Sequence, residues 1–191
     1  MAKAIGSKIC LDSTENIYAI EFRSCVEDLL MLEDVKNLDK YVQHLNTSRL
    51  QHSINVSYYS YLACKKLGLD YRSAARGGIL HDLYLYDWKL ERQPEGMHAS
   101  AHPKIALRNA QKNIKLNEIE IDSIIKHMWP ITVIPPKYKE SMVVTFADKY
   151  CATVEIAYQL FILIFGKLLF LISNGFKRFS YFFEKKYGKK L

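Results

Sequence analysis

The chain has 191 residues, of which 25% are charged, and a formal net charge of +7 at pH 7. This length suits one domain with a proper hydrophobic core. The charge is unevenly distributed, because residues 157–191 carry +6 and residues 1–156 only +1. The larger segment shows no continuous basic stripe, so we expect no duplex nucleic acid as a partner.

The start of the chain and its cysteines both bear on the cellular compartment. No continuous apolar signal region precedes Asp12, and the four cysteines are scattered without a CxxC pair. These features predict a cytoplasmic protein with reduced thiols. We expect the cysteines to be small apolar core residues; they are Cys10, Cys25, Cys64 and Cys151.

The spacing of apolar residues predicts helix after helix and no strand. A first helix is expected from a cap at Ser13–Thr14 to about Lys36. A second is expected from a cap at Thr47 or Ser48 to Leu67–Gly68, because Ser and Thr are good N-caps and Gly ends helices.

The middle of the chain predicts two more helices. Asp70 is the expected cap of a helix from Tyr71 to about Tyr86. After a loop, His102 is expected at the N-cap of a helix that begins with Pro103 and ends near Asn113, because Pro is favourable at the first helical position.

A fifth helix is expected to begin after Asn117 and to carry His127 in its last turn, before Trp129–Pro130. A long final segment then follows Pro135–Pro136. We divide the chain into an N-terminal helical segment (1–45), a helical domain (46–156), and an apolar then basic helical segment (157–191).

The last segment has two unbroken apolar runs. From Ala157 to Phe176 its only charged residue is Lys167, and basic residues follow from Lys177. A membrane span needs about 20 mostly apolar residues, which this segment just provides. Three readings stay open: packing on the domain or on the second subunit of a homodimer, attachment to a membrane surface, and a membrane span.

Six residues of types that bind transition metals recur at intervals of roughly 20 to 30 residues, so different helices can direct them to one centre. They are His52, His81, Asp82, His102, His127 and Asp148. Asp82 and Asp148 lie in small and apolar stretches, where a buried carboxylate is unfavourable unless its charge is compensated. A bound metal supplies that compensation, so we predict a metal site.

The order His, His-Asp, His, His, Asp over residues 46–154 resembles the HD-domain superfamily of metal-dependent phosphohydrolases, in its six-ligand version. The local sequence around His52 and His81 is most similar to that of small HD-domain proteins of the Firmicutes. The resemblance implies an all-α HD-domain helical bundle. It implies a first ion held by His52, His81, Asp82 and Asp148. Asp82 would bridge to a second ion, completed by His102 and His127.

The implied cofactors are two divalent transition metal ions, iron or manganese by preference, with zinc or cobalt as alternatives. The implied reaction is cleavage of a phosphate ester or anhydride by a metal-activated hydroxide, with Asp82 as the catalytic bridging ligand. We expect a small phosphorylated substrate, a nucleotide. The Gly-Tyr-Pro motif of cyclic-dinucleotide enzymes is missing, which disfavours that substrate.

Several neighbours are candidates for contact with substrate. Arg49, one turn before His52, is expected to grip it, and His98 is expected near the mouth of the site. Lys126 directly precedes His127, and Lys149 directly follows Asp148. Adjacent residues on a helix point about 100° apart, so both lysines are expected to face solvent. Tyr84, Tyr86 and Trp88 are considered as an aromatic wall against which the base of a nucleotide could pack.

Two other classes of function share this ligand order. One is the HD-fold di-iron oxygenase that acts on a small polyol or phosphonate, and the other is a metal-binding regulatory domain without catalysis. The sequence does not separate the oxygenase from a hydrolase, since its distinguishing features are a substrate-clamping lysine and a closed pocket. Superfamily frequency favours the hydrolase.

Overall fold

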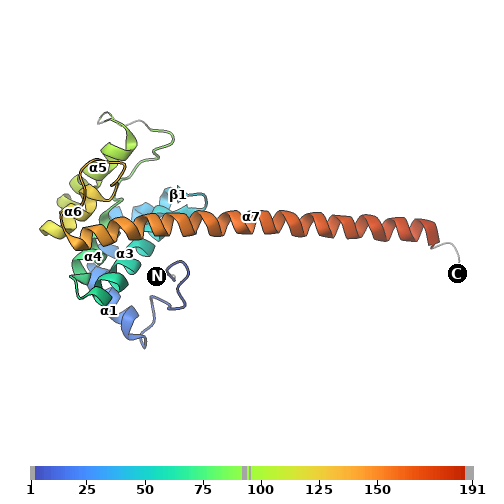
Figure 1. Cartoon of the computed structure of the whole chain (residues 1–191), viewed down its shortest axis with the longest axis horizontal. Coiled ribbons are helices and arrows are strands. Elements are labelled where there is room, and N and C mark those ends of the chain that lie inside the picture. Colours follow the sequence, from blue (N-terminus) through green and yellow to red (C-terminus); the bar gives the residue numbers. More distant parts are fainter. Residues whose placement is uncertain (1–2, 92–93, 95, 188–191) are drawn as a thin grey trace. The chain divides into compact units, whose positions relative to one another are not determined.

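The computed structural model describes residues 3–91, 94 and 96–187. Its helices are α1 (Ile17–Leu30), α2 (Glu33–Asn37), α3 (Arg49–Leu67), α4 (Tyr71–Leu80), α5 (His98–Asn113), α6 (Glu118–Lys126) and α7 (Lys139–Tyr187), with a 3-10 turn at Leu38–Lys40 (Figure 1). The chain forms two compact units that divide between Glu155 and Ile156. We call the residues up to Glu155 the body and those from Ile156 the tail.

The all-α prediction is confirmed, although a short hairpin was not anticipated. Strands β1 (Val42–His44) and β2 (Thr47–Ser48) pair antiparallel, with Val42 opposite Ser48 and His44 opposite Thr47. Leu45, in the turn between the strands, has a φ of 49°. The hairpin leads directly into α3 and places Gln43 and His44 near the start of that helix.

Four helix ends follow the capping residues in the sequence. The Ser48 side chain accepts a hydrogen bond from the Gln51 N–H at the start of α3, and Gly68 ends that helix with a φ of 68°. Asp70 caps α4 through the Ser73 N–H. At α6, Asn117 and Glu120 form a reciprocal capping box.

The first predicted helix is wrong at both ends. Asn16, rather than Ser13–Thr14, caps α1, because its side chain accepts hydrogen bonds from the N–H groups of Tyr18 and Ala19. The helix stops at Leu30, and Leu32 is extended. A separate helix, α2, then begins at Glu33, where two acidic residues in the first turn interact favourably with the helix dipole.

The predictions for α4 and α5 are also corrected. Helix α4 ends at Leu80, so His81 is its C-cap instead of lying inside it. Helix α5 begins at His98, so His102 is not an N-cap and Pro103 lies inside the helix. Pro103 lacks an N–H and removes one backbone hydrogen bond from α5, yet the helix continues to Asn113.

Two glycines allow α4 to approach its neighbours closely. A Cβ on Gly78 would lie 2.6 Å from the Ser57 Cα in α3, and one on Gly77 would lie 2.8 Å from the Ser123 Cβ in α6. Real Cβ atoms do not come so close to other heavy atoms, so both positions require glycine. This close packing brings the end of α4, with His81 and Asp82, beside residues of α3 and α6.

The hydrophobic core of the body is continuous from the N-terminal segment to α6. Its members share almost complete burial and include Leu11, Phe22, Leu29, Leu38, Tyr58, Tyr61, Leu80, Leu83 and Ile124. Residues 1–45 therefore contribute to the same core as the helices that carry the candidate ligands. Cys25, Cys64 and Cys151 are buried as expected, whereas Cys10 is exposed.

Candidate metal centre

The six predicted ligands converge in the body. His52 comes from α3, His81 and Asp82 follow α4, His102 comes from α5, His127 follows α6, and Asp148 comes from α7. Their ligand atoms form two groups in which all members lie within 4.8 Å of one another. One group is His52, His81 and Asp148, and the other is Asp82, His102 and His127.

Asp82 directs one oxygen toward each group. Its Oδ2 lies 3.4 Å from the His81 Nε2, while its Oδ1 lies 3.2 Å from the His102 Nε2 and 3.5 Å from the His127 Nε2. In the first group, the His52 Nε2 lies 3.1 Å from the Asp148 Oδ1. A carboxylate placed between two ligand groups is able to bridge two ions.

Backbone carbonyls fix the orientation of three histidines. The Nδ1 atoms of His81, His102 and His127 each lie 2.8 Å from a carbonyl oxygen, of Gly78, His98 and Ile124 respectively. A carbonyl only accepts hydrogen bonds, so each Nδ1 carries the proton. The neutral rings therefore present an Nε2 lone pair to the centre, which is the arrangement typical of metal-binding histidines.

The same centre holds polar atoms whose contacts are unfavourable without a cation. The Nε2 atoms of His102 and His127 lie 2.8 Å apart, although neither neutral ring has a proton there to share. The His81 Nε2 and the Asp82 Oδ1 are buried with no hydrogen-bond partner among the described residues. Such orphaned atoms are rare in proteins, and their convergence fits a metal site.

The protonation states of the two carboxylates and of His127 also suit metal binding. Although burial opposes it, the surrounding imidazoles of His81, His102 and His127 hold the pKa of Asp82 well below its usual range. The pKa of Asp148 is likewise lowered against burial, chiefly by a hydrogen bond with His52. Burial lowers the pKa of His127. Ionised carboxylates and a neutral imidazole are the forms that bind metal.

Glu155 is a residue of the candidate site that the sequence did not identify. Its carboxylate is fully buried, accepts a hydrogen bond from the His52 Nδ1 at 3.0 Å, and accepts another from the Asn55 Nδ2 at 2.7 Å. It fixes the His52 ring as the carbonyls fix the other three. Although burial lowers it, hydrogen bonds with Asp148 and Glu155 raise the pKa of His52 to about 10. The sequence signal was the spacing, since Glu155 follows Asp148 by two helical turns on α7.

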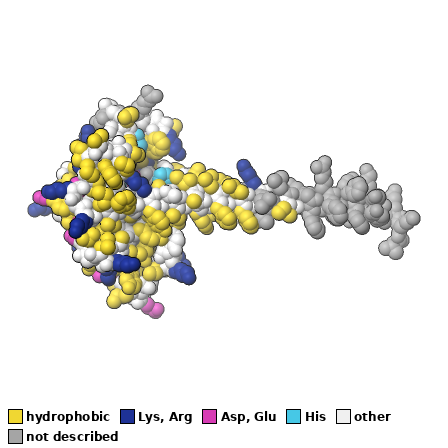
Figure 2. All heavy atoms as spheres, viewed as in Figure 1, with side chains coloured by type: hydrophobic (Ala, Val, Ile, Leu, Met, Phe, Trp, Pro, Cys, Tyr) yellow, Lys and Arg dark blue, Asp and Glu magenta, His cyan; other side chains and the backbone are white. Residues whose placement is uncertain are grey.

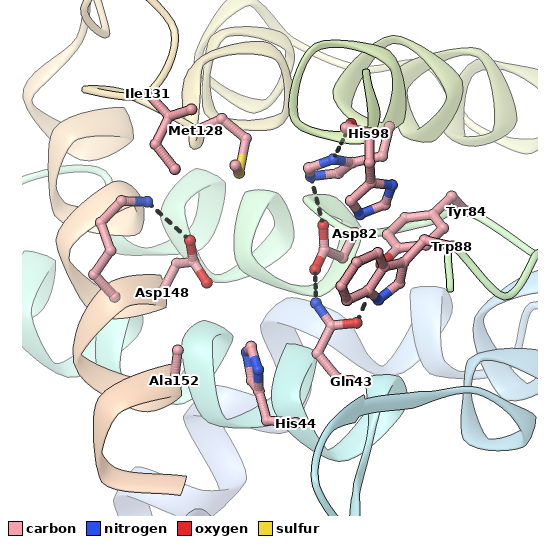
Figure 3. A pocket seen from close by; sticks show the side chains of 12 residues that line it. Gln43, His44, Asp82, Tyr84, Trp88, His98, Met128, Ile131, Asp148 and Ala152 are labelled. Atoms are coloured by element: carbon pink, nitrogen blue, oxygen red, sulfur yellow. Dashed lines mark hydrogen bonds and ion pairs between the residues drawn. The ribbon is translucent and has the colours of Figure 1, made fainter. Parts of the chain in front are cut away.

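A cavity of about 260 Å³ opens onto the centre. Figure 3 shows Asp82 and Asp148 facing it from different elements, with Tyr84, Trp88 and His98 together on one side and Met128 and Ile131 on another. The other lining residues are Gln43, His44, His102, Lys149 and Ala152. Three candidate ligands, Asp82, His102 and Asp148, are thus accessible to a small molecule.

Lys149 lines this cavity, contrary to the expectation that it faces solvent. Its Nζ donates to the His127 carbonyl at 2.7 Å and to the Asp148 Oδ2 at 3.1 Å. The expectation failed because a helix position fixes the Cβ direction, whereas the long lysine side chain can turn its ammonium back toward the site. Lys126 does not line this cavity.

Arg49 does not lie where a substrate-gripping residue would. It is fully buried and donates to the Tyr84 carbonyl at 2.6 Å and to the Gln43 Oε1 at 2.9 Å. Gln43 in turn donates to the Asp82 Oδ2 at 2.5 Å. The guanidinium therefore acts indirectly on the site, because it orients Gln43 and the chain that follows Asp82.

His98 lies at the cavity, as expected, but in an ordered stack at the start of α5. Its ring is parallel to those of Trp88 and His102, with centroids 5.0 Å and 4.5 Å away. Of the three aromatic residues considered for a wall, Tyr84 and Trp88 line the cavity, and Tyr86 does not. His44 also lines it, and its ring centroid lies 5.1 Å from that of His52.

The family of the chain follows from this geometry and from comparison with known proteins. The HD domain model matches residues 49–153, which is more than half of the chain. The chain belongs to the HD-domain family of metal-dependent phosphohydrolases, as the ligand pattern predicted.

The similar curated proteins are ribonucleases Y. One from Clostridium tetani is 35% identical over 80 residues, which cover 42% of this chain and 15% of that protein. One from Oceanobacillus iheyensis is 32% identical over 88 residues, which cover 46% of this chain and 15% of that protein. This chain thus matches a small part of these relatives' length. No solved structure matches it.

Proposed function

We propose that this protein hydrolyses a phosphate ester or anhydride of a nucleotide with a water nucleophile, which would be activated by two divalent transition metal ions held by the six candidate ligands. The observation that carries this proposal is that four histidines and two carboxylates form two groups of close ligand atoms, and that Asp82, His102 and Asp148 of these groups line one cavity. When bound, the two ions would lower the pKa of a shared water and offset the charge of the phosphoryl oxygens.

The lining of the cavity supports a water nucleophile. Among the described residues that line it there is no serine, threonine or cysteine. Asp82 would be a ligand of both ions, since its two oxygens face the two ligand groups. Gln43 keeps the Asp82 carboxylate oriented by its hydrogen bond to Oδ2.

Two parts of the lining suit a nucleotide. Among the described residues that line the cavity, Lys149 is the only lysine or arginine. Its ammonium can bind a non-bridging phosphate oxygen. Trp88, Met128 and Ile131 supply flat and apolar surface for a base. The similarity to ribonucleases Y adds support for a phosphodiester between nucleotides as one substrate class.

Metal analysis and a hydrolysis screen test the proposal. The purified protein should contain two transition metal ions per chain and should release phosphate or nucleoside monophosphate from mononucleotides, dinucleoside polyphosphates or short RNA. Asp82→Asn should abolish turnover and lower metal content, because it removes the bridging charge. Asp34→Asn, a matched change away from the site, should have neither effect.

Other outcomes would redirect the assignment. Full activity of the Asp82→Asn protein would refute the mechanism. His102→Ala or His127→Ala with two ions still bound would refute the assignment of the second group. Dioxygen consumption with a small polyol or phosphonate, without phosphate release, would favour an oxygenase. Two bound ions with no turnover of any of these substrates would favour a regulatory domain.

A further inference from the structure

The tail exposes an unusual amount of apolar surface. Between Ile156 and Phe165 eight large apolar side chains are exposed, including Phe161 at 63% and Ile164 at 67% (Figure 2). Among the described helices, only the stretch Lys139–Lys167 of α7 is long and apolar enough to cross a membrane, and just 11% of its most apolar part is buried. A core helix would be mostly buried, whereas the tail by itself leaves these apolar side chains uncovered.

The distribution of these side chains identifies the kind of partner. Residues 160–165 are six consecutive apolar residues, and successive residues of a helix turn by about 100°. Their side chains therefore point in every direction around the helix. Packing on a protein surface or on a second helix needs one apolar stripe, and a helix that lies in a membrane interface needs a polar face. A helix that is apolar on every side is covered either by a bilayer or by the core of a large protein, and the length and charges of the tail favour the bilayer.

The length and charges of the tail agree with a bilayer. Residues 156–176 contain one charged residue, Lys167, and at about 1.5 Å per residue they extend about 31 Å, close to the thickness of a hydrocarbon core. From Lys177 onward six basic residues and one acidic residue follow. Basic segments next to a membrane helix bind anionic headgroups.

We propose that residues 156–176 insert into a lipid bilayer and that the basic segment after them binds anionic headgroups, so that the tail attaches the HD-domain body to a membrane. Lys167 is the residue that opposes insertion. This proposal is independent of the reaction that the body catalyses, because it rests only on the tail.

Flotation of the full chain with vesicles tests the proposal. The protein should float with vesicles of phosphatidylcholine and phosphatidylglycerol at a three-to-one ratio, and it should stay bound through washes with high salt and alkaline carbonate. Lys167→Leu should increase the bound fraction. The double change Phe161→Asp and Ile164→Asp should reduce it by at least roughly tenfold. Val133→Asp, a change at an exposed apolar residue of the body, should leave flotation unchanged.

Three results would overturn the inference. Complete recovery without detergent and without flotation would exclude insertion. Release by salt alone would show electrostatic adsorption of the basic segment. Flotation that is absent while the chain sediments as a dimer, and becomes a monomer with the double change, would make a second copy of the chain the partner of the tail.

Discussion

Replacing Glu155 by glutamine tests how the body holds the candidate metal ligand His52. The Glu155 carboxylate accepts hydrogen bonds from the His52 Nδ1 at 3.0 Å and from the Asn55 Nδ2 at 2.7 Å, and it is fully buried. Glutamine keeps the shape but has one accepting oxygen and one donating amide. In either orientation the amide group faces a buried donor. With the oxygen at the Oε1 position the amide lies against the His52 Nδ1, and with the oxygen at the Oε2 position it lies against the Asn55 Nδ2.

The expected loss can be worked out from this contact. An unsatisfied buried donor costs about 1–3 kcal/mol. Each 1.4 kcal/mol is a factor of about ten, so the loss corresponds to roughly 5- to 150-fold in affinity if it falls on the ligand geometry of His52. This range overlaps the roughly 10- to 100-fold loss typical when a carboxylate behind a metal-binding histidine is removed. Glu155→Gln should therefore weaken the site that contains His52 by about that factor.

Competition with a chromophoric chelator measures this effect. The ion of the His52 group should be lost at lower chelator concentration, while the ion of the Asp82, His102 and His127 group should be retained. Saturating metal should restore most of the turnover, because Glu155 acts through His52. Glu118→Gln, at a side chain that is 80% exposed, is the matched control. Equal affinity in wild type and Glu155→Gln, or equal weakening of both ions, would refute the reasoning.

Three further changes probe other parts of the body. Gly78→Ala should lower the free energy of unfolding, measured in urea, by about 1–3 kcal/mol, because the new Cβ would lie 2.6 Å from the Ser57 Cα. An unchanged midpoint of urea unfolding would contradict the close approach of α3 and α4. Lys149→Met should keep the metal content but raise KM for phosphorylated substrates by about tenfold, with Lys149→Arg recovering part of it; an unchanged KM would show that Lys149 does not bind substrate. The hydrogen bond from Lys65 lowers the pKa of Glu21 below 4.5, so its stabilisation is present above pH 4.5 and is lost as the pH falls through the lowered pKa. The stability difference between wild type and Glu21→Gln should therefore shrink in acid, and a difference that stays constant between neutral pH and about pH 2 would exclude this linkage.

Local chemistry made much of the fold predictable from the sequence. Ser48, Asp70 and Asn117 cap helices because their side chains accept free N–H groups within a few residues, and this depends only on neighbours in the chain. The helix ends near the site were not predictable in this way. At the end of α4, the His81 side chain bonds the Gly78 carbonyl, and the chain turns at Asp82 into the core.

The candidate ligands were also identifiable from the sequence, because their residue types, order and spacing are those of the HD-domain pattern. The roles of their neighbours were not. Arg49 looked available to a substrate, but the packing of the hairpin and the 84–86 turn encloses it completely. Lys149 looked exposed, but its ammonium reaches back to the His127 carbonyl.

Glu155 shows most clearly what only the tertiary structure decided. By itself it is an acidic residue near the end of an apolar stretch, and its partner His52 lies 103 residues earlier. The two meet because α3 and α7 present these side chains to each other inside the body. The sequence by itself determined which atoms can bind metal, whereas the packing of the helices decided which other side chains hold those atoms in place, since such contacts join residues that are distant along the chain.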